Sequence, residues 1–155
     1  MRTAKVLVMV MCVALAASTA IGAESVRSAK VLDLEGKVEV KNQAGAWMPA
    51  DIDMVLNQGD MIRTQNDSFA LLNVDGMAQT ATVEVKENSE LTLAELMEDR
   101  AEKTQSTLLD LAIGEILIKA KKLHSEQSRF EVKTPTSIVG VRGTTFSVSV
   151  EAEGE

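Results

Sequence analysis

Two aspartates are the strongest candidates for acid–base chemistry in this chain of 155 residues. Asp60 follows Gly59 and Asp75 precedes Gly76, so each aspartate stands at a glycine turn signal. General acid–base catalysis needs a second group within hydrogen-bond reach, and no histidine or nucleophile accompanies either aspartate in the sequence. We therefore expect both carboxylates to accept hydrogen bonds from backbone N–H groups of their turns.

Nucleophilic and metal-binding chemistry has few candidate residues. Ser137 and Thr144 carry hydroxyl groups, but neither lies in a Gly-x-Ser-x-Gly elbow, and we expect structural roles for both. The chain has one cysteine, Cys12, and one histidine, His124. Zinc and iron sites of the usual kind need clusters of such ligands, so we expect no metal site and no cofactor. These observations predict a protein that is not an enzyme.

A short basic cluster and a single tryptophan are the candidate interaction residues. Lys121, Lys122 and His124 lie in a polar segment that we expect to be a solvated loop, with attraction of an anionic partner as the alternative. Trp47 is the only tryptophan, and the chain has no tyrosine. Carbohydrate platforms usually expose several aromatic rings, so we expect Trp47 to pack in the core or at a sheet edge. An exposed binding role for Trp47 is the alternative.

The N-terminus has the layout of a secretory signal peptide. Arg2 and Lys5 precede an unbroken apolar run over residues 6–17, and small residues follow it. The run is shorter than the roughly 20 residues that span a bilayer. Cleavage after Ala20 fits the small-x-small rule better than cleavage after Ala23, and both stay open. We expect a periplasmic or secreted protein, with a retained membrane anchor as the alternative.

The charge of the chain argues against two classes of partner. The whole chain has a formal net charge of −7, and removal of residues 1–23, which hold two basic and no acidic residues, leaves −9. Phosphate backbones and anionic membrane surfaces would repel such a chain. We therefore expect no nucleic-acid partner and no stable membrane span after cleavage.

Strand patterns dominate the chain after residue 30. Apolar and polar or charged residues alternate at a period of two over residues 36–41, 82–86, 130–133 and 146–150. Glycine and Asp-Gly turn signals separate such segments, and no convincing amphipathic helix is present. The predicted fold class is therefore all-β. The period alone does not decide between a solenoid and a sandwich.

These patterns predict one domain. We expect residues 1–23 to be the signal peptide, residues 24–30 a short linker, residues 31–150 the β domain and residues 151–155 an acidic tail. The mature domain has no cysteine, so its apolar core must stabilise it without disulfides in an oxidising compartment.

The segment from residue 93 to residue 103 is ambiguous, because it is rich in helix-forming residues. Its apolar residues fade after Met97, whereas a helix packed on a core would keep an apolar stripe. We predict two strands, over about 90–97 and 107–113, joined by a charged tip, with a short helix at the tip as the alternative. Residues 108–119 form either a strand pair or one bent strand.

Two segments of the chain carry a motif each. The first, from Trp47 to Gly76, has a Gly-Asp turn, a threonine and a strand that ends in Asp-Gly. The second has a Thr-Pro step followed by Val-Arg-Gly-Thr-Thr-Phe. Together they resemble the FecR domain, which occurs in the periplasmic part of iron-dicitrate-type regulators and in many other exported bacterial proteins. The signature positions are Gly59, Asp60, Thr64, Asp75, Gly76, Thr134, Pro135, Gly140, Arg142, Gly143, Thr144 and Phe146.

The resemblance covers about residues 31–150 and implies a short-stranded β-solenoid or roll, with a β-sandwich as the alternative. The regulator members carry an anti-sigma segment and a transmembrane helix before this domain, where this chain has the predicted signal peptide. The resemblance therefore implies the domain without the signalling role. We expect an exported, non-enzymatic binding module whose partner is an unknown envelope protein or cell-wall glycan. The alternative is a regulatory sensor that works in trans with a separate membrane or sigma/anti-sigma partner.

The side chain of Arg142, in the second segment, has two possible positions. An inward guanidinium would bond carbonyl groups or pair with a carboxylate, for which we predict Asp60 of the first segment. In an extended chain, however, Val141 and Arg142 point to opposite faces. If Val141 faces the core, Arg142 faces outward, where it can meet a partner. The inward pair is the prediction and the outward role the alternative.

The predicted cleavage is tested by the intact mass of the exported protein. We expect the mature chain to begin at Ile21 or Glu24, the residues that follow the two candidate cleavage points. A species in the envelope fraction that still contains Met1 would show that the segment is an anchor.

Overall fold

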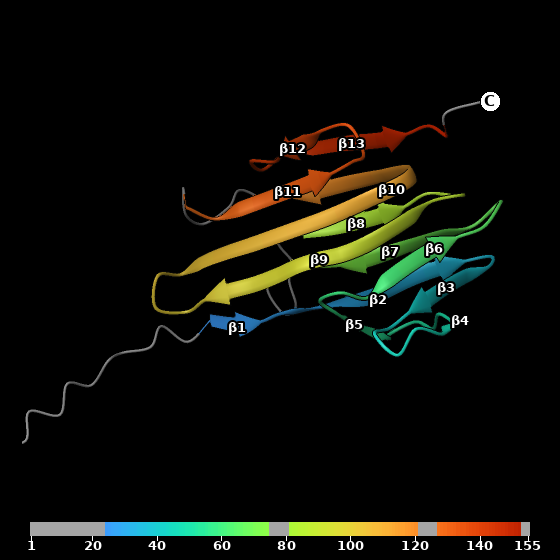
Figure 1. Cartoon of the computed structure of the whole chain (residues 1–155), viewed down its shortest axis with the longest axis horizontal. Coiled ribbons are helices and arrows are strands. Elements are labelled where there is room, and N and C mark those ends of the chain that lie inside the picture. The colour runs from blue at the N-terminus through green and yellow to red at the C-terminus, as the bar shows by residue number, and fades with distance from the viewer. Residues whose placement is uncertain (1–23, 75–80, 121–126, 153–155) are drawn as a thin grey trace, which may run out of the picture.

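The computed structural model describes residues 24–74, 81–120 and 127–152, and every helix or strand in these residues is a β-strand (Figure 1). The strands are β1 (Glu24–Val26), β2 (Ser28–Glu35), β3 (Val38–Lys41), β4 (Trp47–Pro49), β5 (Val55–Asn57), β6 (Met61–Thr64), β7 (Phe69–Asn73), β8 (Ala81–Val85), β9 (Glu90–Asp99), β10 (Thr104–Ala120), β11 (Arg129–Lys133), β12 (Ile138–Gly140) and β13 (Thr145–Val150). The described part of the chain contains no helix that could cross a membrane. The prediction of an all-β fold is confirmed.

All thirteen strands belong to one sheet, which curls into a half-barrel (Figure 1). The sheet has two halves. The first half holds β1, β3, β4, β6, β9, β11, β12 and the beginning of β10, and the second half holds β2, β5, β7, β8, β13 and the end of β10. The narrower expectation of a solenoid or roll, with a sandwich as its alternative, stays a prediction.

Strand β10 is common to both halves of the sheet. Its residues 106–110 pair in parallel with β11, while residues 114–119 pair antiparallel with β13. On its other edge β10 pairs first with β9 and then with β8. Residues 108–119 therefore form one bent strand, which was one of the two arrangements that the sequence left open.

A single apolar core lies between the two halves. Alternate side chains of each strand point into this core. In β3, for example, Val38 and Val40 are buried while Glu39 is partly exposed. Leucine, isoleucine and valine side chains of both halves fill the centre of this core. The largest fully buried side chains are Leu56, Ile62, Leu72, Leu91, Leu93, Leu96, Leu109, Leu111, Ile116, Ile118, Val31 and Val74.

The bend of β10 lies at Gly114, which has a φ of +95°. A β-carbon at this position would overlap the Oγ and Cα atoms of Ser89, so no side chain fits between the two segments. Glycine is needed here both for its backbone conformation and for this close approach. Beside it, the Ser89 hydroxyl accepts a hydrogen bond from Glu115 N at 2.9 Å and donates to the Glu87 and Glu115 carbonyl groups.

Residues 24–30, which we expected to form a linker, belong instead to strands β1 and β2. The Arg27 guanidinium between them donates to the carbonyl oxygens of Val74, Met97 and Ser106 and to the Thr107 hydroxyl. These bonds satisfy carbonyl groups at the ends of strands from both halves. Backbone pairing of β1 with β9 and of β2 with β5 also holds this segment. Its few apolar residues gave no strand pattern in the sequence.

The ambiguous middle segment is the hairpin of β9 and β10, so the prediction of two strands is confirmed and both strands are longer than predicted. The tip of the hairpin is a turn rather than a helix. There, the Asp99 carboxylate accepts hydrogen bonds from the backbone N–H groups of Ala101 and Glu102. This Asp turn ends β9 without any helical residue.

The crowding at Gly114 generates a stability prediction. Gly114→Ala places a β-carbon on Ser89, so we expect it to lower the free energy of unfolding by at least about 3 kcal/mol in urea denaturation. Gly45→Ala is the matched control, because Gly45 also has a positive φ, +88°, but has no atom within 4 Å of the added carbon. We expect the control to cost about 1 kcal/mol from backbone strain alone. Equal losses would contradict the close approach of β10 to Ser89.

Candidate functional site

An aromatic and basic cluster lies on the outer face of the first half of the sheet, at edge strand β4. The register places Lys41 opposite Trp47 and Glu39 opposite Arg63. Since the alternate residues of β3 face the core, these four side chains share the outer face. Glu39, Lys41, Trp47 and Arg63 are called the Trp47 cluster below.

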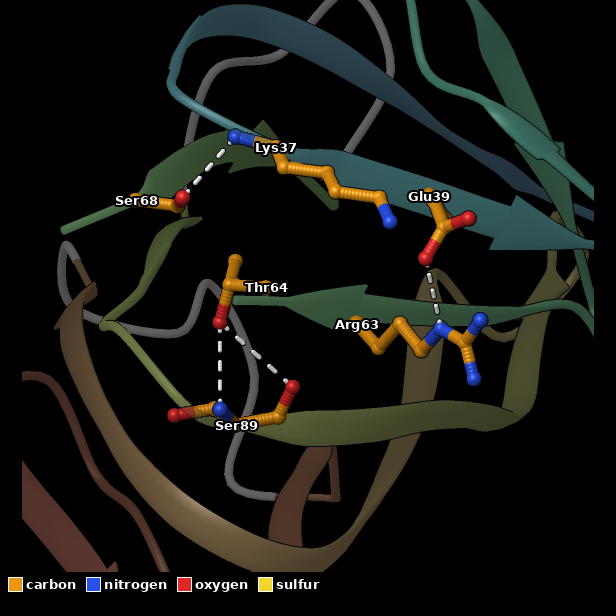
Figure 2. A network of polar contacts seen from close by, with 6 residues as sticks. All are labelled: Lys37, Glu39, Arg63, Thr64, Ser68 and Ser89. Atoms are coloured by element: carbon orange, nitrogen blue, oxygen red, sulfur yellow. Dashed lines mark hydrogen bonds and ion pairs between the residues drawn. The ribbon is translucent and has the colours of Figure 1, made fainter. Parts of the chain in front are cut away.

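The guanidinium of Arg63 is held from two sides in the Trp47 cluster. Its Cζ atom lies 4.0 Å from the centroid of the Trp47 ring, and its Nε atom donates to Glu39 Oε2 at 2.9 Å (Figure 2 shows the bond to Glu39). Lys41 Nζ adds a second positive charge 5.8 Å from the same ring centroid. The hydrogen bond from Arg63, together with the Arg63 and Lys37 charges, holds the pKa of the Glu39 carboxyl below its usual range, although burial opposes this shift.

The Trp47 cluster leaves donor groups open to a ligand. The two terminal nitrogens of Arg63 have no hydrogen-bond partner among the described residues, and the side chain is 32% exposed. Stacking and the ion pair orient the guanidinium before any ligand arrives, so less conformational entropy is lost when it binds. Such an arrangement suits a partner that combines an apolar ring or chain with a carboxylate or phosphate.

The Gly59–Asp60 turn is structural. Asp60 is 5% exposed, and its Oδ2 atom accepts a hydrogen bond from Asn57 N at 2.8 Å. Gly59 has a φ of +89° and donates its N–H to the Leu93 carbonyl at 2.7 Å. The Asp60 carboxylate thus bonds a backbone N–H group three residues before it, and it fixes the chain between β5 and β6.

Thr64, the next signature residue, connects three strands. Its hydroxyl accepts from Ser89 N at 3.1 Å and donates to the Lys86 carbonyl (Figure 2 shows Thr64 and Ser89). The Thr64 backbone N–H also donates to the Ser89 carbonyl, at 3.0 Å. This network joins the end of β6 to the β8–β9 connection, directly beside the bend of β10.

The second signature segment builds β11, β12 and the connection to β13. Thr134 and Ser137 enclose the Pro135 turn, with Thr134 N donating to the Ser137 carbonyl at 2.8 Å and Ser137 N to the Thr134 hydroxyl at 3.0 Å. The Ser137 hydroxyl lies 3.0 Å from the Thr134 hydroxyl within this turn. The connection then places Gly140 at the end of β12 and gives Gly143 a φ of +68°.

The connection ends in residues that contact the second half of the sheet. The Thr144 carbonyl accepts a hydrogen bond from Ala120 N at 3.3 Å. Two residues later, the ring of Phe146 packs against the core. The Thr144 backbone and the Phe146 ring therefore connect this segment to the second half of the sheet.

The predicted buried pair between Arg142 and Asp60 is wrong. Arg142 is exposed, while its neighbour Val141 is buried and donates its N–H to the Phe130 carbonyl at 2.8 Å. Adjacent residues of an extended chain face opposite sides, so the inward position of Val141 forces Arg142 outward. The alternative stated from the sequence therefore describes the side chain of Arg142.

Several predicted residues lie outside the described residues: Asp75, Gly76, Lys121, Lys122 and His124. Trp47 lies at edge strand β4 and is partly exposed, in agreement with the predicted edge position. Within residues 24–74, 81–120 and 127–152, no group of three or more His, Cys, Asp or Glu side chains is placed to hold a metal ion.

Four residues with central positions were missed by reasoning from the sequence: Arg27, Arg63, Ser89 and Gly114. Gly114 had a local signal, since a glycine inside an apolar strand pattern often indicates a bend or a close backbone approach. Arg63 stands between Ile62 and Thr64, which are both buried, in a short strand, so its outward position follows from alternation. The partners of Arg27 and Ser89 are distant in the sequence and leave no local pattern.

Comparison with known proteins gives one match. The model of the family described as FecR protein matches residues 60–155, which include Thr64 and the whole second signature segment. Trp47 and the strands before Asp60 lie outside the matched residues. Neither the curated proteins nor the solved structures contain a match to the chain.

The geometry around Asp60 and Arg142 generates a paired prediction. Asp60→Ala leaves the Asn57 N–H without its acceptor, so we expect a loss of about 1–3 kcal/mol in the free energy of unfolding. Arg142→Ala removes an exposed side chain and should change stability by less than about 0.5 kcal/mol. Asp60→Asn keeps an acceptor oxygen and serves as the control, with a smaller loss. Urea denaturation measures these losses. Similar losses of unfolding free energy for Asp60→Ala and Arg142→Ala that do not add in the double mutant would contradict the exposed position of Arg142.

Proposed function

This chain belongs to the FecR protein family, and from that premise we propose that it is an exported, non-enzymatic binding module of the cell envelope. The family is one of signalling-related regulator domains. The predicted signal peptide supports export to the periplasm or beyond the cell. The ligand class that we propose is a cell-wall glycan with an acidic group.

The Trp47 cluster is the observation that supports this proposal. It presents the only tryptophan of the chain next to an arginine whose terminal nitrogens have no hydrogen-bond partner among the residues that the structure describes. A sugar ring packs against an aromatic side chain, and an acidic group on the same sugar accepts two hydrogen bonds from a guanidinium.

The hydrogen bonds made by the candidate catalytic groups support a non-enzymatic role. The Asp60 carboxylate and the Ser137 hydroxyl are both engaged by the backbone or side chains of their own turns. A general base or a nucleophile needs a free lone pair that points at substrate. Both groups instead serve the geometry of the chain.

A regulatory sensor that works in trans is the second candidate, because the family is one of signalling-related regulator domains. A separate membrane protein would then transmit the signal. Deletion of this chain should change the transcriptome under envelope stress. An unchanged transcriptome would argue against the sensor role, and it would not affect the proposal of a binding module.

Binding to purified cell-wall sacculi tests the proposed function. Trp47 is the only tryptophan, so its fluorescence reports on the site directly while co-sedimentation measures the bound fraction. We expect saturable binding, and a loss of about tenfold in affinity for Trp47→Leu and for Arg63→Lys, which keeps the charge without the two-nitrogen fork.

Ile52→Ala is the control, because Ile52 is another exposed apolar residue, 55% exposed, that lies outside the Trp47 cluster. Its affinity should equal that of the unchanged chain. Absence of binding to sacculi, or equal binding by all variants, would reject the Trp47 cluster as a glycan site. If the unchanged chain recovers a protein partner from crosslinked envelope extract and Trp47→Leu does not, the ligand of the Trp47 cluster is that protein rather than a glycan.

A further inference from the structure

The sheet forks along one edge of β10. Residues 106–110 of this edge pair with β11 and residues 114–119 pair with β13, so residues 111–113 pair with neither strand. Among the described strands, β12 pairs only with β11, and β13 only with β10. The half-barrel is therefore open between β12 and β13, on the opposite side of the sheet from β4 (Figure 1).

A groove of about 870 Å³ lies in this fork. Its walls are the Thr134–Ser137 turn and Val139 on one side and residues 147–150 of β13 on the other, with Ile113 between them. Most of these side chains are small or carry hydroxyl groups, so they leave the backbone of β13 accessible. Ile113 is 38% exposed and offers an apolar contact within the groove.

The free edge of β13 has backbone groups that point away from β10. The bond from Ala120 N to Thr144 O, at 3.3 Å, identifies these residues as a hydrogen-bonded antiparallel pair. Pairs alternate along an antiparallel ladder, so Phe146 and Val148 bond to β10 in turn. The N–H and C=O groups of Ser147 and Ser149 therefore face away from β10. Such an edge is a template for an added strand.

Negative charge near one end of the β13 edge favours a positively charged partner segment. A second hollow of about 740 Å³ shares Ile113, Ser149 and residues 150–152 with the groove. Its carboxylates are Asp67, Glu84, Glu87, Glu115 and Glu151. Its single basic residue, Lys86, is paired with Glu84. Positive side chains on an added strand would meet uncompensated negative charge there.

We infer that the free edge of β13 takes up an extended, basic segment of a partner protein as an added β-strand. The segment lies in the groove with small or apolar residues toward Ile113 and with lysine or arginine toward the acidic hollow. This surface is separate from the Trp47 cluster and extends the proposed function to a protein partner. A second copy of the chain is a poor occupant, because each copy has a net charge of −7.

Synthetic peptides test this inference on the full exported chain. The probe is an acetylated, amidated peptide of about seven residues that alternates lysine and valine, long enough to cover β13. We expect saturable binding by calorimetry at physiological salt. Replacing lysine by glutamate, or methylating alternate backbone nitrogens of the peptide, should each weaken binding about tenfold or more.

Two substitutions in β13 separate strand addition from simple charge attraction. Ser149→Pro removes one outward N–H and leaves the ladder to β10 in place, so we expect peptide affinity to fall about tenfold. Ser149→Ala keeps the N–H and should bind like the unchanged chain. Thermal unfolding shows whether Ser149→Pro is folded, and the methylated peptide gives the same test without any substitution.

Three outcomes would overturn the inference. They are equal binding of the methylated and unmethylated peptides, unchanged affinity of a folded Ser149→Pro variant, and light scattering that shows a dimer dissociated by Ser149→Pro. The last outcome would assign the edge to a second copy of the chain. Trp47→Leu should leave peptide binding unchanged, so the failure of the glycan proposal is distinguishable from the failure of this one.

Discussion

The close approach of β10 to Ser89 at Gly114 is the constraint on which the rest of the structure depends. Because no side chain separates the two segments, the Ser89 hydroxyl replaces a strand partner for the Glu115 N–H. The Lys86 carbonyl, which faces the same junction, accepts from the Thr64 hydroxyl instead. These bonds satisfy the polar groups where the ladder is interrupted, so β10 passes from one half of the sheet to the other within a single core.

This shared strand also decides where the molecule presents its surfaces. The change of neighbours along β10 from β11 to β13 opens the fork and leaves β13 with one free edge. At the far end of the same sheet, β4 carries Trp47 beside Arg63. The two surfaces that we propose for binding therefore lie at separate places on one sheet.

Alternation of apolar and polar residues was enough to predict the all-β fold and a half-buried strand over residues 36–41. The Gly-Asp signal indicated a turn at Asp60. The partners of the polar groups were beyond reach, because they are distant in the chain: Arg27 bonds to Thr107 across 80 positions. For Arg142, the glycines on both sides suggested an inward guanidinium, whereas Val141 is buried and Arg142 is exposed. The Trp47 cluster could not be predicted, because the pairing of β3 with β4 and β6 brings its residues together and the sequence does not show which strands pair.

Native-state hydrogen exchange along β13 tests the central claim, that β10 holds both halves of the sheet while one edge stays open. The account predicts alternation: slow exchange at Phe146 and Val148, whose N–H groups face β10, and fast exchange at Ser147 and Ser149, whose N–H groups face away. The Glu115 N–H, bonded to Ser89, should be among the slowest of the chain. Uniformly slow exchange along β13 would show that the edge is already covered, and fast exchange at Glu115 would show that the junction does not hold the sheet together.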